Sequence, residues 1–364
     1  MGRAQPTISE ILSGKRLISP EIAIEFEDAL NGEVHAIDLL GKQSEYLLKN
    51  ARKENGSSDI RLKSRIQEEF PISEMEKRQW IPKKKSAEGK LSALLEFANN
   101  SVDLDHIAPP FPTVALARQS ETLGYLSPTS KASRAWQFRV RELAEITPVK
   151  EFDHSTFVTK GMVELRALAK DLKGVARVPQ TLARYGVRFV VVSHLTKTKL
   201  DGAAMWLDGD ERRQPVIALT LRFGHIDKFW FNLAHEIQHI KHLHEFSVDV
   251  ETDAHHSTAE DGLQEIEDQA NDGASEWLIP QARLSSFIRR NSPKFTESSI
   301  IAFSEMVDVH PGILVGTLQH MGDLSYKTRL TRFKTDIRDQ VFLAAMADGF
   351  PSLPVVKTKR ITNW

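Results

Sequence analysis

The sequence predicts an α+β protein that is mostly helical, with a small β-sheet packed on a pair of helices and a helical segment ahead of them. Three observations predict this class. An apolar, β-rich run at 216–221 directly precedes an amphipathic helical pattern that contains His-Glu-x-x-His at 235–239. An acidic helical pattern occupies 263–279 and stops before a proline. Short helical patterns also dominate the chain before residue 174.

The composition narrows the classes of protein and of site. The chain has 364 residues, a formal net charge of -1 and a pI of about 6.9, so it lacks the overall basic field of many nucleic-acid binders. It has 13 histidines and no cysteine, so a metal site has to use imidazole and carboxylate ligands. No apolar run approaches the roughly 20 residues that span a bilayer, and the amino end does not read as a signal peptide. We therefore expect a cytoplasmic protein with no membrane partner.

Three short helices are expected in the amino-terminal domain, residues 1–53. The first covers 6–12, and the second begins at Ser19-Pro20, a pair typical of a helix start. The third covers about 36–52. The side chains expected to be buried in the second and third helices are Ile22, Phe26, Leu30, Leu39, Leu40, Tyr46 and Leu47.

This order of helices, with Gln43 and Tyr46 in the last one, resembles the carboxy-terminal half of a Cro/C1-type helix-turn-helix domain of HigA-like antidotes. The resemblance implies that the helix at 6–12 enters the major groove of DNA. The two preceding helices of that domain are missing, so the helix-turn-helix is partial and DNA is only a possible partner. The competing interpretation is a helical bundle used for packing or dimerisation. The residues that would contact DNA are Thr7, Ser9, Lys15 and Arg16.

The middle of the chain is expected to join two domains. A polar linker follows residue 53, and a helical connecting region covers 60–150, with Trp136 in the core of a helix at 132–146. The next domain covers 152–335 and begins with a helix at 157–173. Three strands, at 187–192, 203–207 and 216–221, are expected to form the small sheet beside the helix that carries the histidine motif, and residues 336–364 form a tail.

The pattern His-Glu-x-x-His on a helix is typical of a metal site. His235 and His239 lie one turn apart, so both imidazoles can reach one ion, and Glu236 lies beside them where it can accept a proton from water. Zinc sites in hydrolases use three protein ligands and leave one position open. Three carboxylates of the acidic helix compete for the third place, and because they point in different directions at most one can serve: Glu265, Glu267 and Asp268.

The motif, followed by Glu-x-x-Ala-Asn at 267–271 and Leu-Ile-Pro at 278–280, resembles the ImmA/IrrE family of zinc metallopeptidases. The segments 200–204, 227–231, 310–313 and 316–320 also look like that family, so with the amino-terminal match the resemblance covers most of the chain. It implies a narrow protein substrate, such as a transcriptional repressor or an antidote-type regulator. It also implies a Zn2+ site of thermolysin type with Glu236 as catalytic residue and three metal ligands: His235, His239 and Glu267.

Two residues depart from the pattern of that family. Gln238 replaces a usual glycine, and Gly273 replaces a usual aromatic residue. Looser packing beneath the ligand helix is therefore expected.

Four of the six histidines that follow the motif lie within residues 241–261. His242 and His244 are expected to be solvated or to support a ligand, because the motif already fills the available face of the helix. The polar stretch at 241–261 is expected to be a surface loop. Within it, His255 and His256 are candidates for stabilising the tetrahedral oxyanion, although a solvated role is the commoner one.

Two functions compete on this basis. The first is a zinc-dependent endopeptidase of narrow specificity that cleaves a repressor or antidote-type regulator. The second is a non-enzymatic DNA-binding or antitoxin-like transcriptional regulator whose metal site is structural or vestigial. The sequence specifies neither the scissile bond nor the oligomeric state.

Overall fold

The structure is a computed structural model of the chain. It describes residue 11 and residues 17–31, 34–54, 57–98, 131–196, 198, 200–244, 247–250 and 260–348. The chain divides into two compact units, Met1–Gln67 with Lys84–Leu91, and Glu68–Lys83 with Ser92–Trp364. The helix predicted at 6–12, the DNA-contact residues Thr7, Ser9, Lys15 and Arg16, and the loop histidines His255 and His256 lie outside the described residues, Ile11 excepted.

The first unit contains α2 (Pro20–Ala29), α3 (Ala36–Glu54) and most of α4 (Ser57–Glu69). The predicted start of α2 is confirmed, because the Ser19 side chain accepts a hydrogen bond from the Ile22 amide. The Gln43 side chain exchanges two hydrogen bonds with the backbone of Ile18 and so ties α3 to the residues before α2.

Burial in this unit differs from expectation at several positions. Ile22 is buried as predicted, and Phe26, Leu39 and Leu40 are half-buried. Leu30 is 43% exposed and Tyr46 is 64% exposed. Leu30 lies beyond the end of α2, and the ten residues of α2 are too few to cover the nineteen of α3. The prediction that both side chains are buried is therefore wrong.

The second unit is mostly helical around a mixed sheet with the strand order β4-β2-β3-β1-β5. The three predicted strands are present as β1 (Arg188–Val191), β2 (Leu200–Trp206) and β3 (Pro215–Leu219). β1 is parallel to β3, and β2 is antiparallel to β3. Two short strands were not predicted: β4 (Ser247–Val250) pairs with β2, and β5 (Met346–Ala347) pairs with β1. Residues 247–250 are thus an edge strand, which corrects the expectation of a loop throughout 241–261.

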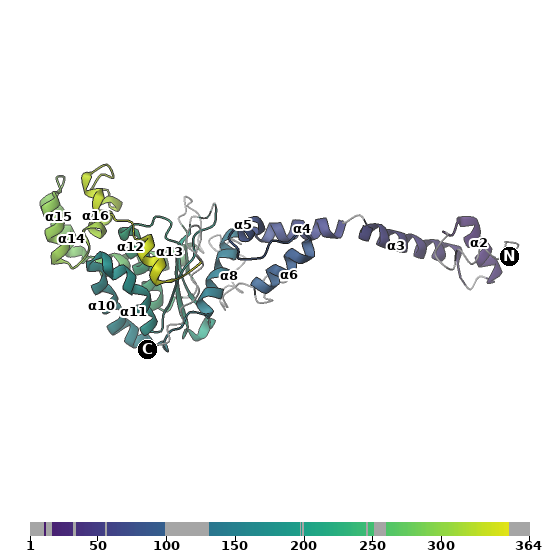
Figure 1. Ribbon diagram of the computed structural model, residues 1–364, viewed down its shortest axis with the longest axis horizontal. Coiled ribbons are helices and arrows are strands. Elements are labelled where there is room, and N and C mark those ends of the chain that lie inside the picture. The colour runs from purple at the N-terminus through teal and green to yellow at the C-terminus, as the bar shows by residue number, and fades with distance from the viewer. Residues whose placement is uncertain are drawn as a thin grey trace. The chain divides into compact units, whose positions relative to one another are not determined.

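Buried side chains lie on both faces of β1 and β3. The side chains of Phe189, Val191, Ile217 and Leu219 belong to the main hydrophobic core, which includes residues of α11 (Val178–Arg184) and α12 (Ile226–Lys241). The alternating residues Val190, Val216 and Ala218 are also buried but lie outside that core. On that side α8 (Lys131–Glu145) contacts β1, and Figure 1 shows the sheet between α8 and α12.

The helices before the sheet confirm one prediction and correct another. α8 matches the helix expected at 132–146, and Trp136 is fully buried as predicted. The helix expected at 157–173 is instead broken into a π-helical turn (Phe157–Gly161), α10 (Met162–Ala167) and two 3-10 turns (Leu168–Lys170 and Leu172–Arg177). The break lies at Asp171, which adopts an extended backbone and caps the second 3-10 turn with its side chain.

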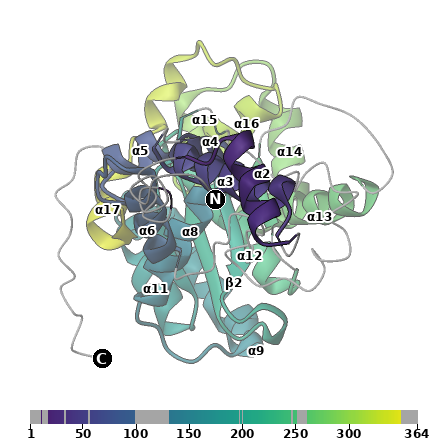
Figure 2. The same cartoon turned by 90° about the vertical axis from the view of Figure 1, so that its right-hand side faces the viewer.

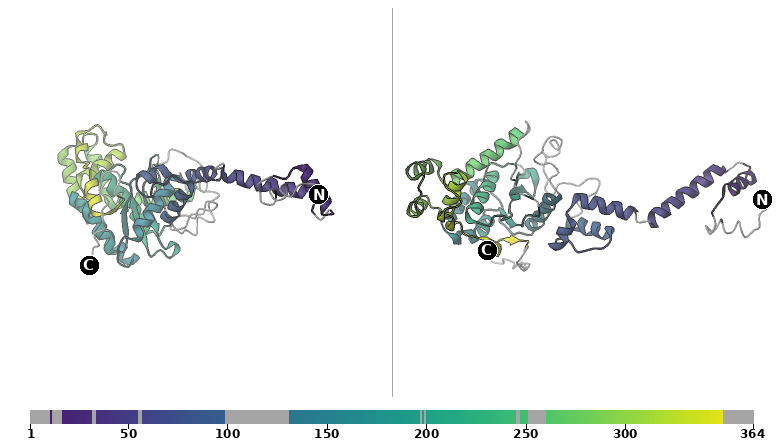
Figure 3. Two further views of the ribbon diagram at one scale, coloured as in Figure 1. Left: turned by 45° about the vertical axis from the view of Figure 1, so that its right-hand side comes forward. Right: turned by 90° about the horizontal axis from the view of Figure 1, so that it is seen from above.

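The remaining helices of the second unit complete its outline. In Figure 2, α9 lies at the end of the unit opposite α15 and α16, and Figure 3 shows α14 to α16 gathered at one end of it. Within the described residues no single helix is both long and apolar enough to cross a membrane; α15 and α16 pass such a test only as a pair bent by 108°. The remaining helices of the second unit are α5 (Ile72–Lys77), α9 (His154–Thr156), α13 (Glu260–Leu278), α14 (Gln281–Asn291), α15 (Glu297–Met306), α16 (Pro311–His320) and α17 (Arg338–Ala344). α6 (Ala87–Phe97) is divided between the two units after Leu91.

Candidate metal centre

The candidate metal centre lies where α12 crosses α13. On α12 the predicted apolar stripe of Leu233, Ile237 and Ile240 is fully buried, which turns the histidines of the next face toward α13. On α13 the small residues Ala270 and Ala274 are also fully buried, and they allow the two helices to pack closely. α13 ends at Leu278, two residues before Pro280, as predicted.

His235, His239 and Glu267 come together between these two helices. The Nε2 atoms of the two histidines are 2.9 Å apart. A Glu267 carboxylate oxygen lies 3.1 Å from His235 Nε2, and the other lies 3.7 Å from His239 Nε2. Each residue offers one ligand atom within 4.8 Å of the others. The structure thus brings Glu267 to two histidines that precede it by 32 and 28 positions in the sequence.

The spacing of these atoms fits a zinc ion. Nitrogen and oxygen ligands at about 2.0–2.2 Å from a tetrahedral zinc lie roughly 3.4 Å from one another. The three measured separations fall on either side of that value. Two imidazoles and one carboxylate are also the donor set of a common class of catalytic zinc site.

Hydrogen bonds on the far side of each ring orient the two imidazoles. His235 Nδ1 lies 3.0 Å from Asn271 Oδ1, which can only accept, so this nitrogen carries the proton. His239 Nδ1 lies 2.9 Å from His244 Nδ1, and His244 Nε2 lies 3.2 Å from Gln269 Oε1. A proton on His244 Nε2 and one on His239 Nδ1 satisfy both contacts. Both ligand histidines therefore keep the lone pair of Nε2 directed at the centre.

The electrostatics of the centre favour neutral imidazole. The pKa of His239 is lowered to about 3, chiefly because the ring is buried and secondarily because His235 lies beside it. A metal-ligating histidine has to be neutral, and at neutral pH the buried His239 ring already is.

Glu236 is fully buried beside the sheet. A Cβ atom on Gly202 of β2 would lie 2.7 Å from Glu236 Oε1 and 2.9 Å from Leu219 Cδ2. The absence of a side chain at Gly202 thus creates the space that the Glu236 carboxylate occupies against the sheet. Sequence reasoning identified Glu236 but not this dependence on Gly202, nor the contacts of Asn271 and Gln269.

The other candidate ligands lie away from the centre. Glu265 and Asp268 are exposed, and Asp268 accepts a hydrogen bond from Gln264. His242 is also exposed and stacks on His244 with 5.4 Å between ring centroids. His244 itself supports a ligand, in agreement with one of the two roles expected for it.

The two residues that depart from the family pattern face each other. A Cβ atom on Gly273 would lie 2.7 to 3.0 Å from three side-chain atoms of Gln238. Gln238 is 1% exposed, so its side chain fills the space above Gly273. The expectation of looser packing is wrong, because the larger residue on α12 occupies the volume that the glycine on α13 leaves.

Three residues paired across neighbouring strands connect the space occupied by Glu236 to the end of β1. Gly202 pairs with Leu219, and Leu219 pairs with Val191 at the end of β1. The loop that leaves β1 after Val191 is held by α8, because Trp136 Nε1 donates to the Val192 carbonyl at 2.8 Å.

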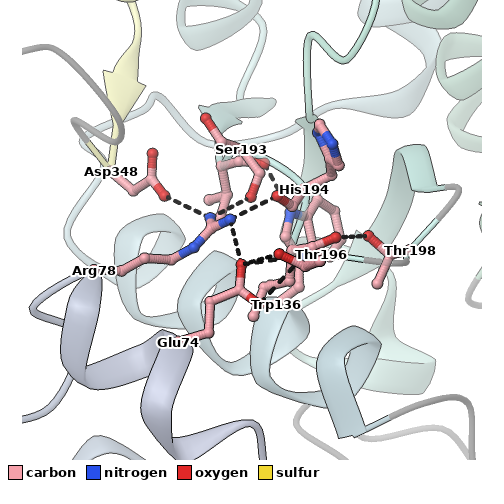
Figure 4. Close-up of polar contacts among 10 residues, drawn as sticks. Glu74, Arg78, Trp136, Ser193, His194, Thr196, Thr198 and Asp348 are labelled. Atoms are coloured by element: carbon pink, nitrogen blue, oxygen red, sulfur yellow. Dashed lines mark hydrogen bonds and ion pairs between the residues drawn. The ribbon is translucent and has the colours of Figure 1, made fainter.

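α5 and its C-terminal turn hold the same loop (Figure 4). The Arg78 guanidinium donates to the carbonyl oxygens of Ser193 at 2.8 Å and His194 at 2.7 Å. It also pairs with Glu74, whose carboxylate accepts a hydrogen bond from the Thr196 amide. Hydrogen bonds to the backbone of residues 192–194 therefore hold the end of β1, where Val191 pairs with Leu219.

No family model, curated protein or solved structure matches this chain. Support for a function therefore comes from the residues of the chain itself.

Proposed function

We propose that the protein is a zinc-dependent endopeptidase of narrow specificity. The convergence of His235, His239 and Glu267, with correctly oriented imidazoles and a buried carboxylate beside them, carries this proposal. The three residues would hold the ion. When bound, zinc would supply Lewis acidity that activates water and polarises a peptide carbonyl.

Glu236 would handle the protons of the reaction. Its carboxylate follows the first ligand directly in the sequence and is held away from bulk solvent against Gly202. In this position it would accept a proton from the attacking water and return it to the leaving amine. Asn271 and His244 would keep the two ligand rings from rotating.

The proposed substrate is a regulator of transcription, a repressor or an antidote-type protein. This part of the proposal comes from the resemblance to ImmA/IrrE metallopeptidases, and the cytoplasm is the compartment that fits it.

Metal analysis of purified protein tests the site. We expect about one zinc per chain in the wild type, loss of the zinc in Glu267→Ala, and retention in Glu265→Ala, which removes an exposed carboxylate two positions away. Circular dichroism of each variant checks that the fold is retained. Equal zinc content in the two variants would exclude Glu267 as a ligand.

Cleavage tests the activity. Wild-type protein and Glu236→Gln are incubated with a peptide library made from a bacterial proteome, and new termini are identified by mass spectrometry. We expect zinc in both proteins but new termini only with the wild type, because glutamine cannot accept the proton. Zinc binding without cleavage would favour the non-enzymatic regulator with a structural metal site.

A further inference from the structure

A cavity of about 400 Å³ lies beside the candidate metal centre. It is bounded by α12, α13 and α16, together with residues that follow α16. Its volume falls within the range of roughly 300–1,000 Å³ that is usual for small-molecule sites. The lining residues with apolar groups include Phe231, Leu278, Ile313, Thr317, Met321 and Tyr326.

The cavity is one helical turn from the metal ligands. Phe231 precedes His235 by four residues on α12, a rise of about 6 Å on the same face. On α13, the lining residue Ser275 follows Asn271 by four residues, and Asn271 contacts His235 at 3.0 Å. Both helices therefore lead from the centre into the cavity. A chain bound across the centre would place a neighbouring side chain at this cavity.

Most charges around the cavity already have partners within the protein. The buried Asp227 carboxylate pairs with Lys334 at 2.8 Å, and a Glu276 oxygen accepts a hydrogen bond from the Gln281 amide at 2.9 Å. Lys228 lies over the ring of Phe223.

The large side chains of the lining are mostly apolar, and Asp272, Ser275, Gln281 and His320 also line the cavity. Leu278 and Ile313 are buried, and Phe231 is half-buried with the exposed His320 ring beside it at 6.2 Å. Met321 and Tyr326 are 50% and 65% exposed, so two large side chains of the lining keep much of their surface in solvent. This combination suits a bulky apolar guest that would bury the exposed parts of both.

We propose that this cavity is the specificity subsite of the enzyme and that it takes a bulky apolar side chain, leucine, methionine or phenylalanine, next to the scissile bond. The inference rests on the proposed endopeptidase function. It narrows the substrate to polypeptides in which such a residue occupies one fixed position beside the cleaved bond.

Cleavage profiling tests the subsite with a filled variant and a matched control. Thr317→Trp places a large ring at the cavity wall. Ala302→Trp adds the same ring at an exposed position of α15, outside the cavity. We expect the wild type and Ala302→Trp to prefer leucine, methionine or phenylalanine at one position. Thr317→Trp should cut such sites at least about tenfold more slowly than sites with alanine there. An unchanged profile in Thr317→Trp overturns the subsite while leaving the peptidase function intact.

A binding measurement keeps the inference testable without cleavage. Glu236→Gln labelled with ¹³C at the methionine methyl groups is titrated with the N-acetyl amides of leucine, phenylalanine, alanine and glutamate. The Met321 signal is assigned by its loss in Met321→Leu. We expect saturable shifts of that signal with leucine and phenylalanine derivatives, and none with the other two or in Thr317→Trp. Absence of any saturable shift overturns the proposal.

Discussion

At the residue scale, the orientation of the two candidate ligand histidines depends on side chains that form hydrogen bonds to their rings. Asn271 Oδ1 and His244 Nδ1 accept hydrogen bonds from the Nδ1–H groups of His235 and His239 and so select the tautomer that binds metal. Asn271→Ala and His244→Ala should each weaken zinc binding by about 10–100-fold.

Competition with a chromophoric chelator measures this affinity. His242→Ala is the matched control, because His242 is exposed and contacts His244 only by stacking. An affinity in His242→Ala as low as in His244→Ala would show that the loss is not specific to the orienting bond.

Gln238 and Gly273 give a second prediction at this scale. Gly273→Phe alone should lower the free energy of unfolding by about 1–3 kcal/mol, because its ring meets the buried Gln238 side chain. The double variant Gln238→Gly, Gly273→Phe should regain most of that loss. Urea unfolding of the two single variants and the double variant gives the coupling between the sites. Additive losses would mean that the two residues do not share one space.

Single residues were predictable where a local pattern determines them. The spacing of His235, Glu236 and His239 on one helix is visible in the sequence, and the structure brings Glu267 to them. Gly202 leaves space for Glu236, and His244 orients His239. Both roles depend on how the helices and strands pack, which a local sequence pattern does not indicate. The exchange of volume between Gln238 and Gly273 likewise becomes visible only when both helices are in place.

At the scale of elements, apolar content decides what can be predicted. β1, β2 and β3 carry buried side chains on both faces and are evident as apolar runs. β4 lies in a polar stretch and β5 has only two residues. Both strands pair through backbone hydrogen bonds, which do not require a particular side-chain pattern, so they could not be predicted from the sequence. α12 and α13 were predictable from their apolar stripes and from Pro280.

The start of α16 gives a prediction for pH dependence. His310 Nδ1 accepts a hydrogen bond from the Gly312 amide at 3.1 Å and caps the helix. Burial lowers the pKa of His310 below its ordinary value, and the weaker effect of Asp171 opposes this. Because the folded pKa is the lower one, the stability from the neutral ring is complete above the unfolded pKa of about 6.5 and is lost as the pH falls below it.

His310→Asn isolates this contribution, because asparagine also caps a helix but does not titrate. Between about pH 8 and pH 5.5, the wild type should lose more unfolding free energy than the variant. Urea unfolding at both pH values measures the difference. A wild type that loses no more than the variant would contradict the assignment to His310.

At the scale of the whole second unit, the buried Arg78 joins α5 to the loop after β1. Its side chain is 3% exposed and bonds two backbone carbonyls. Arg78→Met keeps much of the volume but removes these bonds, and it should lower the free energy of unfolding by about 3–5 kcal/mol.

Arg141→Met is the control, because Arg141 pairs with Glu145 on the surface of α8 and should change stability by only about 0.5 kcal/mol. Thermal and urea unfolding compare the two variants. A small effect of Arg78→Met would show that the apolar contacts of α5 suffice to hold the loop.

The absence of cysteine gives the candidate centre a further consequence. This chain can form no disulfide crosslink, yet α12 and α13 meet through residues that one divalent ion could tie together. Because such an ion would bind only the folded state, each tenfold rise in free zinc above its dissociation constant would raise the free energy of unfolding by about 1.4 kcal/mol. The lifetime of the protein in a cell would then follow the supply of the metal, and starvation for zinc would lower the amount of the protein.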